Sequence, residues 1–249
     1  MDNFIKPKIQ ENYDGDIRKV GFELEFSNID MSKVLEILSE VEKFEIKKVN
    51  NFFYKLESED GTYILELDFE LLTKQKLKEE AKKLFEKTSI RIDDKDVDNI
   101  QDFIGDFSKD IVPYEISTPA LPLTKIYKVD ELVSSLSKNN AYGTKDRIYN
   151  AFGLHINMEL ISLDVKSILD YLRAYVILQD FLNHDAKVDL IRKITPFIDN
   201  FKSDYIKYIL NQNYNPTQDE FIEDYIRFNP TRNRSLDMLP ILAHLDEKK

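Results

Sequence analysis

The sequence predicts one α+β domain, in which a curved, mainly antiparallel sheet carries a polar concave face and helices pack on the other face. Two observations predict this fold class. Four short stretches alternate apolar and polar residues with the period of two that a half-buried strand requires. Amphipathic helical segments lie between and after these stretches. Each stretch also places metal-ligand side chains on its polar face, so the pattern predicts a cleft rich in carboxylates.

The first stretch, Val20 to Ser27, reads VGFELEFS. Successive side chains of a strand point to opposite faces. The apolar residues of this stretch therefore share one face: Phe22, Leu24 and Phe26. The other face carries Glu23 and Glu25, two neighbouring anions whose repulsion a divalent cation with oxygen ligands would offset. The solvated face of an antiparallel sheet shows the same Glu-x-Glu pattern, so this stretch alone leaves both interpretations open.

Three further stretches repeat the pattern: residues 62–72, 114–118 and 152–159. Their polar positions include Glu66, Asp68, Glu70, Glu115, Ser117, His155, Asn157 and Glu159. If the four strands share one sheet, we expect their apolar faces to pack under helices, including the face of Leu154, Ile156 and Met158. The polar faces would then line one cleft, whose carboxylate, amide and imidazole groups suit Mg²⁺ or Mn²⁺ better than zinc.

Helical periodicity, caps and turns predict the remaining elements. The predicted helices cover residues 30–43, 73–87, 97–107, 128–138, 163–183, 201–210 and 218–227. Asp30 or Ser32 would cap the first of these helices, and Asp164 or Ser162 would cap the long fifth helix. Two short strands and a turn are predicted at residues 44–49, 52–57 and 58–61.

The composition excludes several classes of protein. The chain has 249 residues, no cysteine and a formal net charge of −11. The absence of cysteine excludes disulfides, thiolate nucleophiles and cysteine-type zinc sites, and the acidic balance argues against a nucleic-acid partner. The N-terminus lacks a basic region followed by an apolar run, and no apolar stretch approaches the ~18–20 residues of a spanning helix. We therefore expect a cytoplasmic protein without a membrane partner, with an N-terminal arm at 1–19 and one domain at 20–249.

The ordered set of motifs resembles the putative amidoligase family, whose members are carboxylate–amine ligases with a glutamine-synthetase-like fold. The matching pieces are GFELEF, ELDFELL, YEISTPAL, GLHINME and RNRSLDMLPIL. They resemble, in order, a first strand with Glu-x-Glu, an Asp-bearing strand, a Glu-Ile/Val-Ser-Pro element, a Gly-x-His-Val-His strand and an arginine-rich segment. The resemblance runs from about Val20 to about Leu245 and implies the fold of that family.

The resemblance also implies a reaction and the residues that would perform it. In the family, ATP phosphorylates a carboxylate, and an amine displaces the phosphate to give an amide. The implied metal ligands are Glu23, Glu25, Glu115 and His155. The implied site acid is Asp68, the implied nucleotide-lining residue is Asn157, and the implied phosphate contacts are Arg192, Arg232 and Arg234, with Arg234 also implied in catalysis. ATP and Mg²⁺ (or Mn²⁺) would be the cofactors, the substrates would be small-molecule or peptide carboxylates and amines, and a homo-oligomer is compatible with this assignment.

Two other functions fit the same residues. Asn157 stands where the family has the second His of its pair, and an amide cannot take a proton. A catalytically inactive relative that binds nucleotide or a partner, or a metal-dependent hydrolase using the same acidic cleft, would carry the same strands. No G-x-x-x-x-G-K-[ST] loop is present, so a P-loop nucleotide site is excluded.

Two sets of residues also have simpler interpretations. A lone His on a strand, such as His155, is often a hydrogen-bonded structural residue rather than a metal ligand. The arginines near the end of the sequence, Arg227, Arg232 and Arg234, would equally pair with acidic groups of the same protein.

Overall fold

The chain divides into two compact units in the computed structural model. Unit 1 comprises Met1–Lys8 and Lys19–Met158, and unit 2 comprises Ile9–Arg18 and Glu159–Lys249. Within them, the structure describes residues 5–26, 29–50, 52–67, 114–139, 153–185 and 199–246. The domain boundary between residues 19 and 20 stays a prediction.

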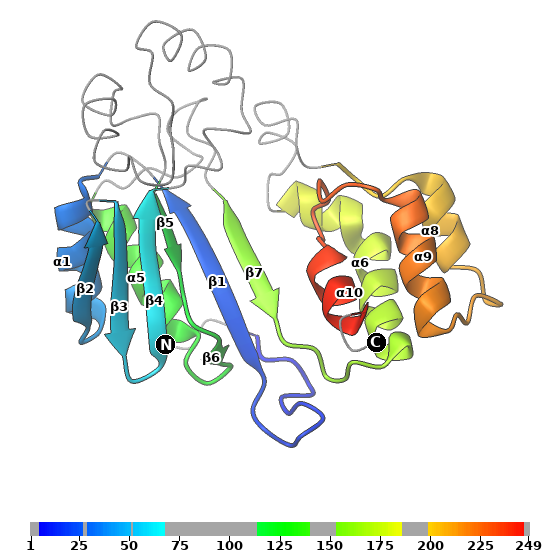
Figure 1. The fold of residues 1–249 in the computed structure, drawn as a ribbon, viewed down its shortest axis with the longest axis horizontal. Coiled ribbons are helices and arrows are strands. Elements are labelled where there is room, and N and C mark those ends of the chain that lie inside the picture. Colours follow the sequence, from blue (N-terminus) through cyan, green and yellow to red (C-terminus); the bar gives the residue numbers. More distant parts are fainter. Residues whose placement is uncertain are drawn as a thin grey trace, which may run out of the picture. The chain divides into compact units, whose positions relative to one another are not determined.

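A seven-stranded antiparallel sheet forms the centre of unit 1 (Figure 1). Its strands are β1 (Lys19–Phe26), β2 (Glu45–Asn50), β3 (Phe53–Ser58), β4 (Gly61–Leu67), β5 (Tyr114–Ser117), β6 (Leu121–Pro122) and β7 (Leu154–Met158). Neighbouring strands follow the order β2-β3-β4-β5-β1, and both β6 and β7 pair with β1. The predicted turn joins β3 to β4, where Gly61 adopts a φ of +124° that side-chain-bearing residues rarely take. The α+β class and the antiparallel sheet are confirmed.

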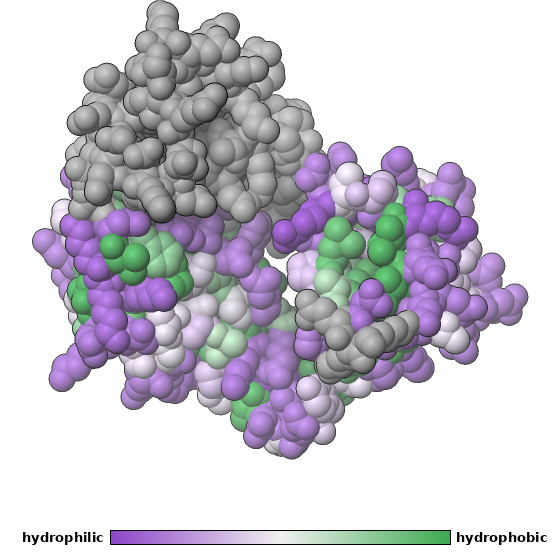
Figure 2. All heavy atoms as spheres, in the orientation of Figure 1, coloured by the Kyte–Doolittle hydropathy of each residue, from purple (hydrophilic) through white to green (hydrophobic). Residues whose placement is uncertain are grey.

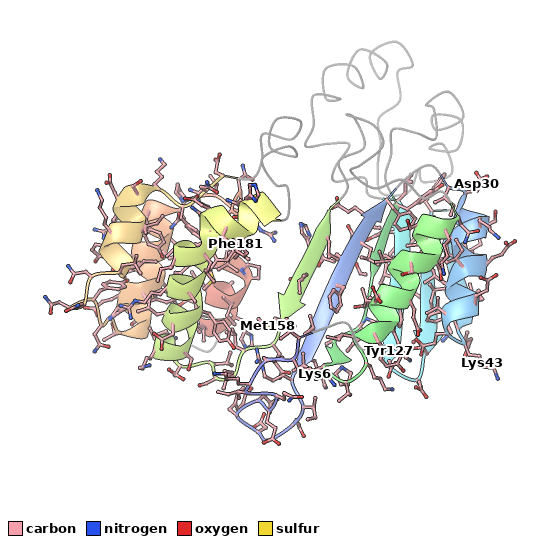
Figure 3. All side chains as sticks on the ribbon, turned by 180° about the vertical axis from the view of Figure 1, so that it is seen from behind. Lys6, Asp30, Lys43, Tyr127, Met158 and Phe181 are labelled. Carbon is pink, nitrogen blue, oxygen red and sulfur yellow. The ribbon has the colours of Figure 1, made fainter. Side chains whose placement is uncertain are left out.

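The apolar face of this sheet packs against α1 (Met31–Val41) and α5 (Tyr127–Lys138), which Figure 3 shows lying across the strands. Burial along β1, β4 and β5 follows the predicted alternation with a period of two. The buried strand residues include Phe22, Leu24, Phe26, Tyr63, Leu65 and Ile116, and the helices contribute Val34, Ile37, Leu38, Val129, Leu132 and Leu136. The side chains of Glu23 and Glu25 point to the opposite face and are only partly buried. One face of the sheet is therefore core, and the other is polar.

The apolar side chains of β7 contradict the prediction that all four strands lie under helices. Leu154, Ile156 and Met158 are 52%, 59% and 45% exposed. β7 pairs with β1, but the core beneath α1 and α5 draws its buried strand residues from β1, β3, β4, β5 and β6 and from none in β7. The prediction is wrong for this strand, because the cluster formed with the two helices includes none of its residues.

Four helices of unit 2 pack around a core rich in aromatic residues. They are α6 (Val165–Asp185), α8 (Ser203–Ile209), α9 (Gln218–Phe228) and α10 (Leu239–Asp246). The ring of Phe201 lies 5.7 Å from that of Tyr205 and 6.3 Å from that of Tyr225. The predicted helices at 163–183, 201–210 and 218–227 are confirmed, whereas α10 was not predicted. Unit 2 is therefore a helical layer with its own hydrophobic core.

A buried arginine connects the segment Ile9–Arg18 to the helices of unit 2 through hydrogen bonds. Arg18 is 1% exposed, and its guanidinium donates hydrogen bonds to the carbonyl oxygens of Glu159 and Ile9 and to the hydroxyl of Tyr171. These bonds satisfy a buried cation with neutral acceptors. This explains why part of the predicted arm belongs to the compact helical unit.

Asp164 caps the N-terminus of α6, as the sequence predicts. Its Oδ1 accepts a hydrogen bond from the backbone N–H of Ser167 at 2.8 Å, and its Oδ2 accepts one from the Ser167 hydroxyl at 2.8 Å. Hydrogen bonds from Ser162 and Ser167 lower the pKa of Asp164 to about 2. The carboxylate is therefore the form that stabilises this end of the helix.

Replacing Asp164 by alanine should lower the free energy of unfolding by about 1 kcal/mol at pH 7, because a cap is lost. Urea denaturation monitored by circular dichroism measures this difference. Since the folded pKa is depressed, the contribution of the carboxylate is present above the ordinary pKa of 3.8 and is lost as the pH falls toward 2. The difference between the two proteins should therefore shrink between about pH 4 and pH 2, and a constant difference over that range would contradict the assignment.

Some predicted elements lie outside the described residues: the end of the third predicted strand at 68–72 and the helices at 73–87 and 97–107. Among the helices that the structure does describe, none has both the length and the apolar character to cross a membrane.

Candidate functional site

Three glutamates form a row across the polar face of the sheet. Glu25 of β1 lies opposite Glu115 of β5, and Glu115 in turn lies opposite Glu66 of β4. Directly opposite residues of an antiparallel pair share a face, with Cβ atoms about 4.5–5.5 Å apart. Ser117 lies opposite Glu23 in the neighbouring row. Figure 2 shows hydrophilic residues around a smaller hydrophobic patch on this side of the sheet, over β2, β3 and β4. Strands distant in sequence thus bring their carboxylates together.

β7 adds an imidazole and an amide beside Glu23. His155 lies opposite Glu23 in the register, and Asn157 lies opposite Gly21. His155 Nδ1 is 2.8 Å from Glu23 Oε2, and Asn157 Nδ2 donates to Glu23 Oε1 at 2.9 Å. The His155 side chain is 61% exposed and the Glu23 side chain 36% exposed. Both carboxylate oxygens of Glu23 therefore have a partner on β7, in a place that solvent reaches.

Local hydrogen bonds hold the carboxylates of Glu25 and Glu115. The backbone N–H of Gly153 donates to Glu25 Oε2 at 2.9 Å, and a Cβ at Gly153 would lie 2.9 Å from the same oxygen. A side chain at residue 153 would therefore require the Glu25 carboxylate, the far end of a flexible side chain, to shift. The Ser117 hydroxyl donates to Glu115 Oε1 at 2.8 Å. Sequence alternation placed Ser117 on the polar face, but it gave no signal for the contact between Gly153 and Glu25.

The ligand atoms of the row do not converge on one point. Among the residues that the structure describes, the three acidic side chains with ligand atoms within 4.8 Å of one another are Glu42, Glu59 and Asp60. The ammonium groups of Lys125 and Lys128 lie among those carboxylates, so protein cations already neutralise that cluster. The polar face of the sheet is the other candidate for a cation site, because it brings carboxylates of three strands beside His155.

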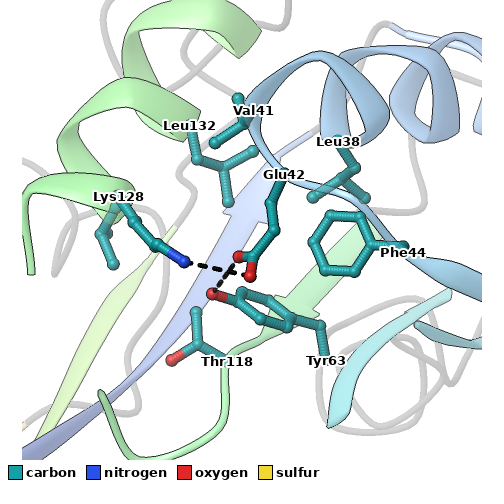
Figure 4. A pocket seen from close by; sticks show the side chains of 9 residues that line it. Leu38, Val41, Glu42, Phe44, Tyr63, Thr118, Lys128 and Leu132 are labelled. Atoms are coloured by element: carbon teal, nitrogen blue, oxygen red, sulfur yellow. Dashed lines mark hydrogen bonds and ion pairs between the residues drawn. The ribbon is translucent and has the colours of Figure 1, made fainter. Parts of the chain in front are cut away.

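Glu42 of this second acidic cluster lies in a charge network beneath the helices, and Figure 4 shows it with Lys128 and Tyr63. Lys128 Nζ lies 3.0 Å from Glu42 Oε1, and the Tyr63 hydroxyl donates to Glu42 Oε2 at 3.3 Å. Burial and the charge of Glu42 raise the pKa of Tyr63. The side chains of Asp60 and Glu42 are only 4% and 8% exposed. Sequence analysis missed this network because Asp60 and Lys128 are 68 positions apart and follow no periodic pattern.

The predicted phosphate-binding arginines that the structure describes lie in unit 2, and each has a protein partner. Arg234 has a side chain that is 5% exposed, and it donates to Asn229 Oδ1 at 3.1 Å and to the carbonyl of Asn233 at 2.9 Å. Arg232 is 72% exposed and pairs with Asp237 at 2.8 Å. Arg234 therefore contributes to the packing of unit 2, whereas Arg232 is accessible to a ligand.

Two predicted site residues, Asp68 and Arg192, lie outside the described residues.

A comparison with known protein families identifies a match. The model of a family described as putative amidoligase enzyme matches residues 16–249, nearly the whole chain. No curated protein and no solved structure matches the chain. The matched region contains every strand of the sheet and every residue of the candidate site.

Proposed function

Because the chain belongs to the putative amidoligase family, we propose that it is an ATP- and Mg²⁺-dependent carboxylate–amine ligase with a glutamine-synthetase-like fold. A substrate carboxylate oxygen attacks the γ-phosphorus of ATP and ADP leaves. The amine nitrogen then attacks the carbon of the acyl phosphate, loses a proton and expels phosphate, which gives the amide. The observation that supports this most is the register that aligns Glu25, Glu115 and Glu66 beside the contact between Glu23 and His155.

The donor groups on the polar face fit Mg²⁺ or Mn²⁺. Carboxylate oxygens from adjacent strands are the hard ligands that these cations prefer, and His155 adds a nitrogen that Mn²⁺ accepts. Glu25, Glu115 and His155 would hold the cation, with Glu23 in contact with His155. The cation would offset the charge of the triphosphate and of the phosphoryl group during transfer. Without that offset, the row of glutamates would repel ATP.

Recognition of the phosphates would fall to the arginines. A guanidinium gives bidentate hydrogen bonds to phosphate oxygens. Arg232 is the stronger candidate, because breaking an exposed ion pair such as that with Asp237 costs little free energy. Arg234 would first have to leave Asn229 and Asn233. The roles of Asp68 and Arg192 rest on the family resemblance alone.

The proposal predicts that the chain releases ADP from ATP and Mg²⁺ only when a carboxylate and an amine are both present. A coupled ADP assay over a panel of amino acids, dipeptides and amines measures this, and mass spectrometry identifies the amide. Equal ADP release without an amine would indicate a hydrolase. Mg²⁺-dependent nucleotide binding without ADP release would indicate a catalytically inactive relative. The presence of Asn157, an amide in place of the family's second imidazole, favours that alternative. Either result contradicts the proposed ligase.

A further inference from the structure

β7 lies at an edge of the sheet, beside β1 (Figure 1). In the part of the chain that the structure describes, β1 is its one strand neighbour. The backbone N–H of Glu25 donates to the carbonyl of Gly153 at 3.0 Å. Hydrogen bonding alternates along an antiparallel pair, so the next residue of β7 and every second one after it turn their backbone groups away from β1. These residues, which form the outer edge of β7, are Leu154, Ile156 and Met158.

The side chains of β7 are exposed on both faces of the sheet. Leu154 lies opposite Leu24 and Ile156 lies opposite Phe22, so the apolar side chains of β7 extend the apolar face of the sheet. His155, between them, points to the polar face and contacts Glu23. One short strand therefore combines a backbone edge, an apolar surface and a residue of the candidate site.

The opposite edge of the sheet, β2, has features that oppose the addition of a strand. Lys47 and Lys48 lie in this strand, and its register with β3 shifts between Lys48 and Asn50. Lysines and bulges are common means of protecting an edge strand. The sequence of β7, LHINM, contains neither lysine nor proline, and its register with β1 is continuous. The outer edge of β7 therefore lacks the protection that β2 has.

We propose that the outer edge of β7 binds the carboxylate substrate, and that this substrate is an extended peptide that joins the sheet as a further strand. This rests on the proposed function and deepens it by naming the substrate class. In such complexes main-chain hydrogen bonds give affinity, and contacts with alternate side chains give selectivity. A peptide antiparallel to β7 directs its C-terminal carboxylate toward the end of β7 where Gly153 contacts Glu25. We expect apolar residues at every second position, beside Leu154 and Ile156.

A second copy of the chain is the other occupant that such an edge could take. Stable dimers bury about 800 Å² on each partner. β7 has five residues, so its edge is only about 17 Å long and covers a small part of that area. A substrate binds reversibly and needs no such area. The short edge therefore fits a peptide better than a second copy.

Two backbone-methylated peptides test the pairing on the unaltered protein. The probe is a fluorescent peptide of alternating valine and serine with a free C-terminus, and fluorescence anisotropy with Mg²⁺ present gives its dissociation constant. Valines opposite Leu154 and Ile156 would turn their N–H groups toward β7. N-methylation of the valines should therefore weaken binding about tenfold, whereas N-methylation of the serines should leave it unchanged. Equal losses, or a larger loss from the serines, would overturn the inference.

Proline variants locate the peptide on the protein. Ile156→Pro removes an N–H that points away from β1, a change that an edge strand tolerates, and it should weaken binding of the probe about tenfold. Ile46→Pro is the matched control, because Ile46 is an exposed apolar residue of the other edge strand. It should bind the probe as the unaltered protein does. Undiminished binding to Ile156→Pro would contradict the inference. Circular dichroism checks both folds, and the methylated peptides decide the question even if a proline variant does not fold.

ADP release separates this inference from the proposed ligase. With ATP, Mg²⁺ and an amine, the valine–serine peptide should have a KM about tenfold below that of free valine. Equal KM values would overturn the peptide site and leave the ligase standing. Peptide binding that depends on Ile156, without ADP release from any carboxylate, would overturn the ligase and leave a peptide-binding edge. A dimer that Ile156→Pro converts to a monomer in analytical ultracentrifugation would assign the edge to a second copy and overturn the inference.

Discussion

The Glu25→Gln protein should fold like the unaltered chain and lose about a thousandfold of its ligase rate. Glu25 lies in the middle of the donor groups, between Glu115 on β5 and the Gly153 amide. In the proposed ligase, loss of one anionic ligand would weaken the hold on a cation that would supply several kcal/mol to the transition state, and about 4 kcal/mol corresponds to that factor. The ADP-release assay at saturating ATP, with Mg²⁺ varied, measures the effect.

Glu57→Gln is the control for this prediction, because it removes a carboxylate from the same face of the sheet on a more distant strand. Its rate should equal that of the unaltered chain. A Glu25→Gln protein with an undiminished rate would remove Glu25 from the site and leave the row of glutamates without a catalytic role.

The Asp60→Asn protein should lose about 3 kcal/mol of its free energy of unfolding. The Asp60 side chain is 4% exposed and contacts the ammonium groups of both Lys125 and Lys128. Removing one charge from a buried ion pair leaves its partners uncompensated, which costs about 3–5 kcal/mol. We expect the lower end of this range because Lys125 is 34% exposed and Glu42 still pairs with Lys128. Chemical denaturation at pH 7 measures the loss.

Acid should weaken this network in the unaltered protein. Burial favours the neutral form of Asp60, but the hydrogen bonds from Lys125 and Lys128 outweigh that effect and lower the pKa of Asp60 below its ordinary 3.8. The contribution of the carboxylate is therefore present above pH 3.8 and is lost as the pH falls through the depressed value. Glu59→Gln is the matched control: its side chain is 73% exposed although it lies 3.1 Å from Lys125, so its loss should stay within about 1 kcal/mol. Equal losses for the two variants would refute the role of burial.

Alternation in the sequence predicted the faces of the strands because it is a local property. A period of two places Phe22 and Leu24 in the core and Glu23 and Glu25 on the polar face, whichever strands are neighbours. It does not determine which residues lie opposite one another. The alignment of Glu25 with Glu115 and Glu66 depends on pairing between distant segments, and the structure alone supplies that register.

Properties that depend on tertiary packing could not be predicted from the sequence. Leu154 and Ile156 have the apolar pattern of a core strand. Both side chains are nevertheless exposed, and neither belongs to the core beneath α1 and α5. Arg234 follows a basic motif, but its guanidinium is buried between Asn229 and Asn233. In both cases the sequence pattern identified the type of side chain. Whether that side chain is buried or exposed depends on packing against segments distant in the sequence.

An anomalous-scattering map of crystals grown with Mn²⁺ tests the shared cation site most directly. We predict a peak on the polar face of the sheet, within about 2.0–2.6 Å of carboxylate oxygens from Glu25 and Glu115 and of a ring nitrogen of His155. A peak among Glu42, Glu59 and Asp60, with none beside Glu25, would contradict the account.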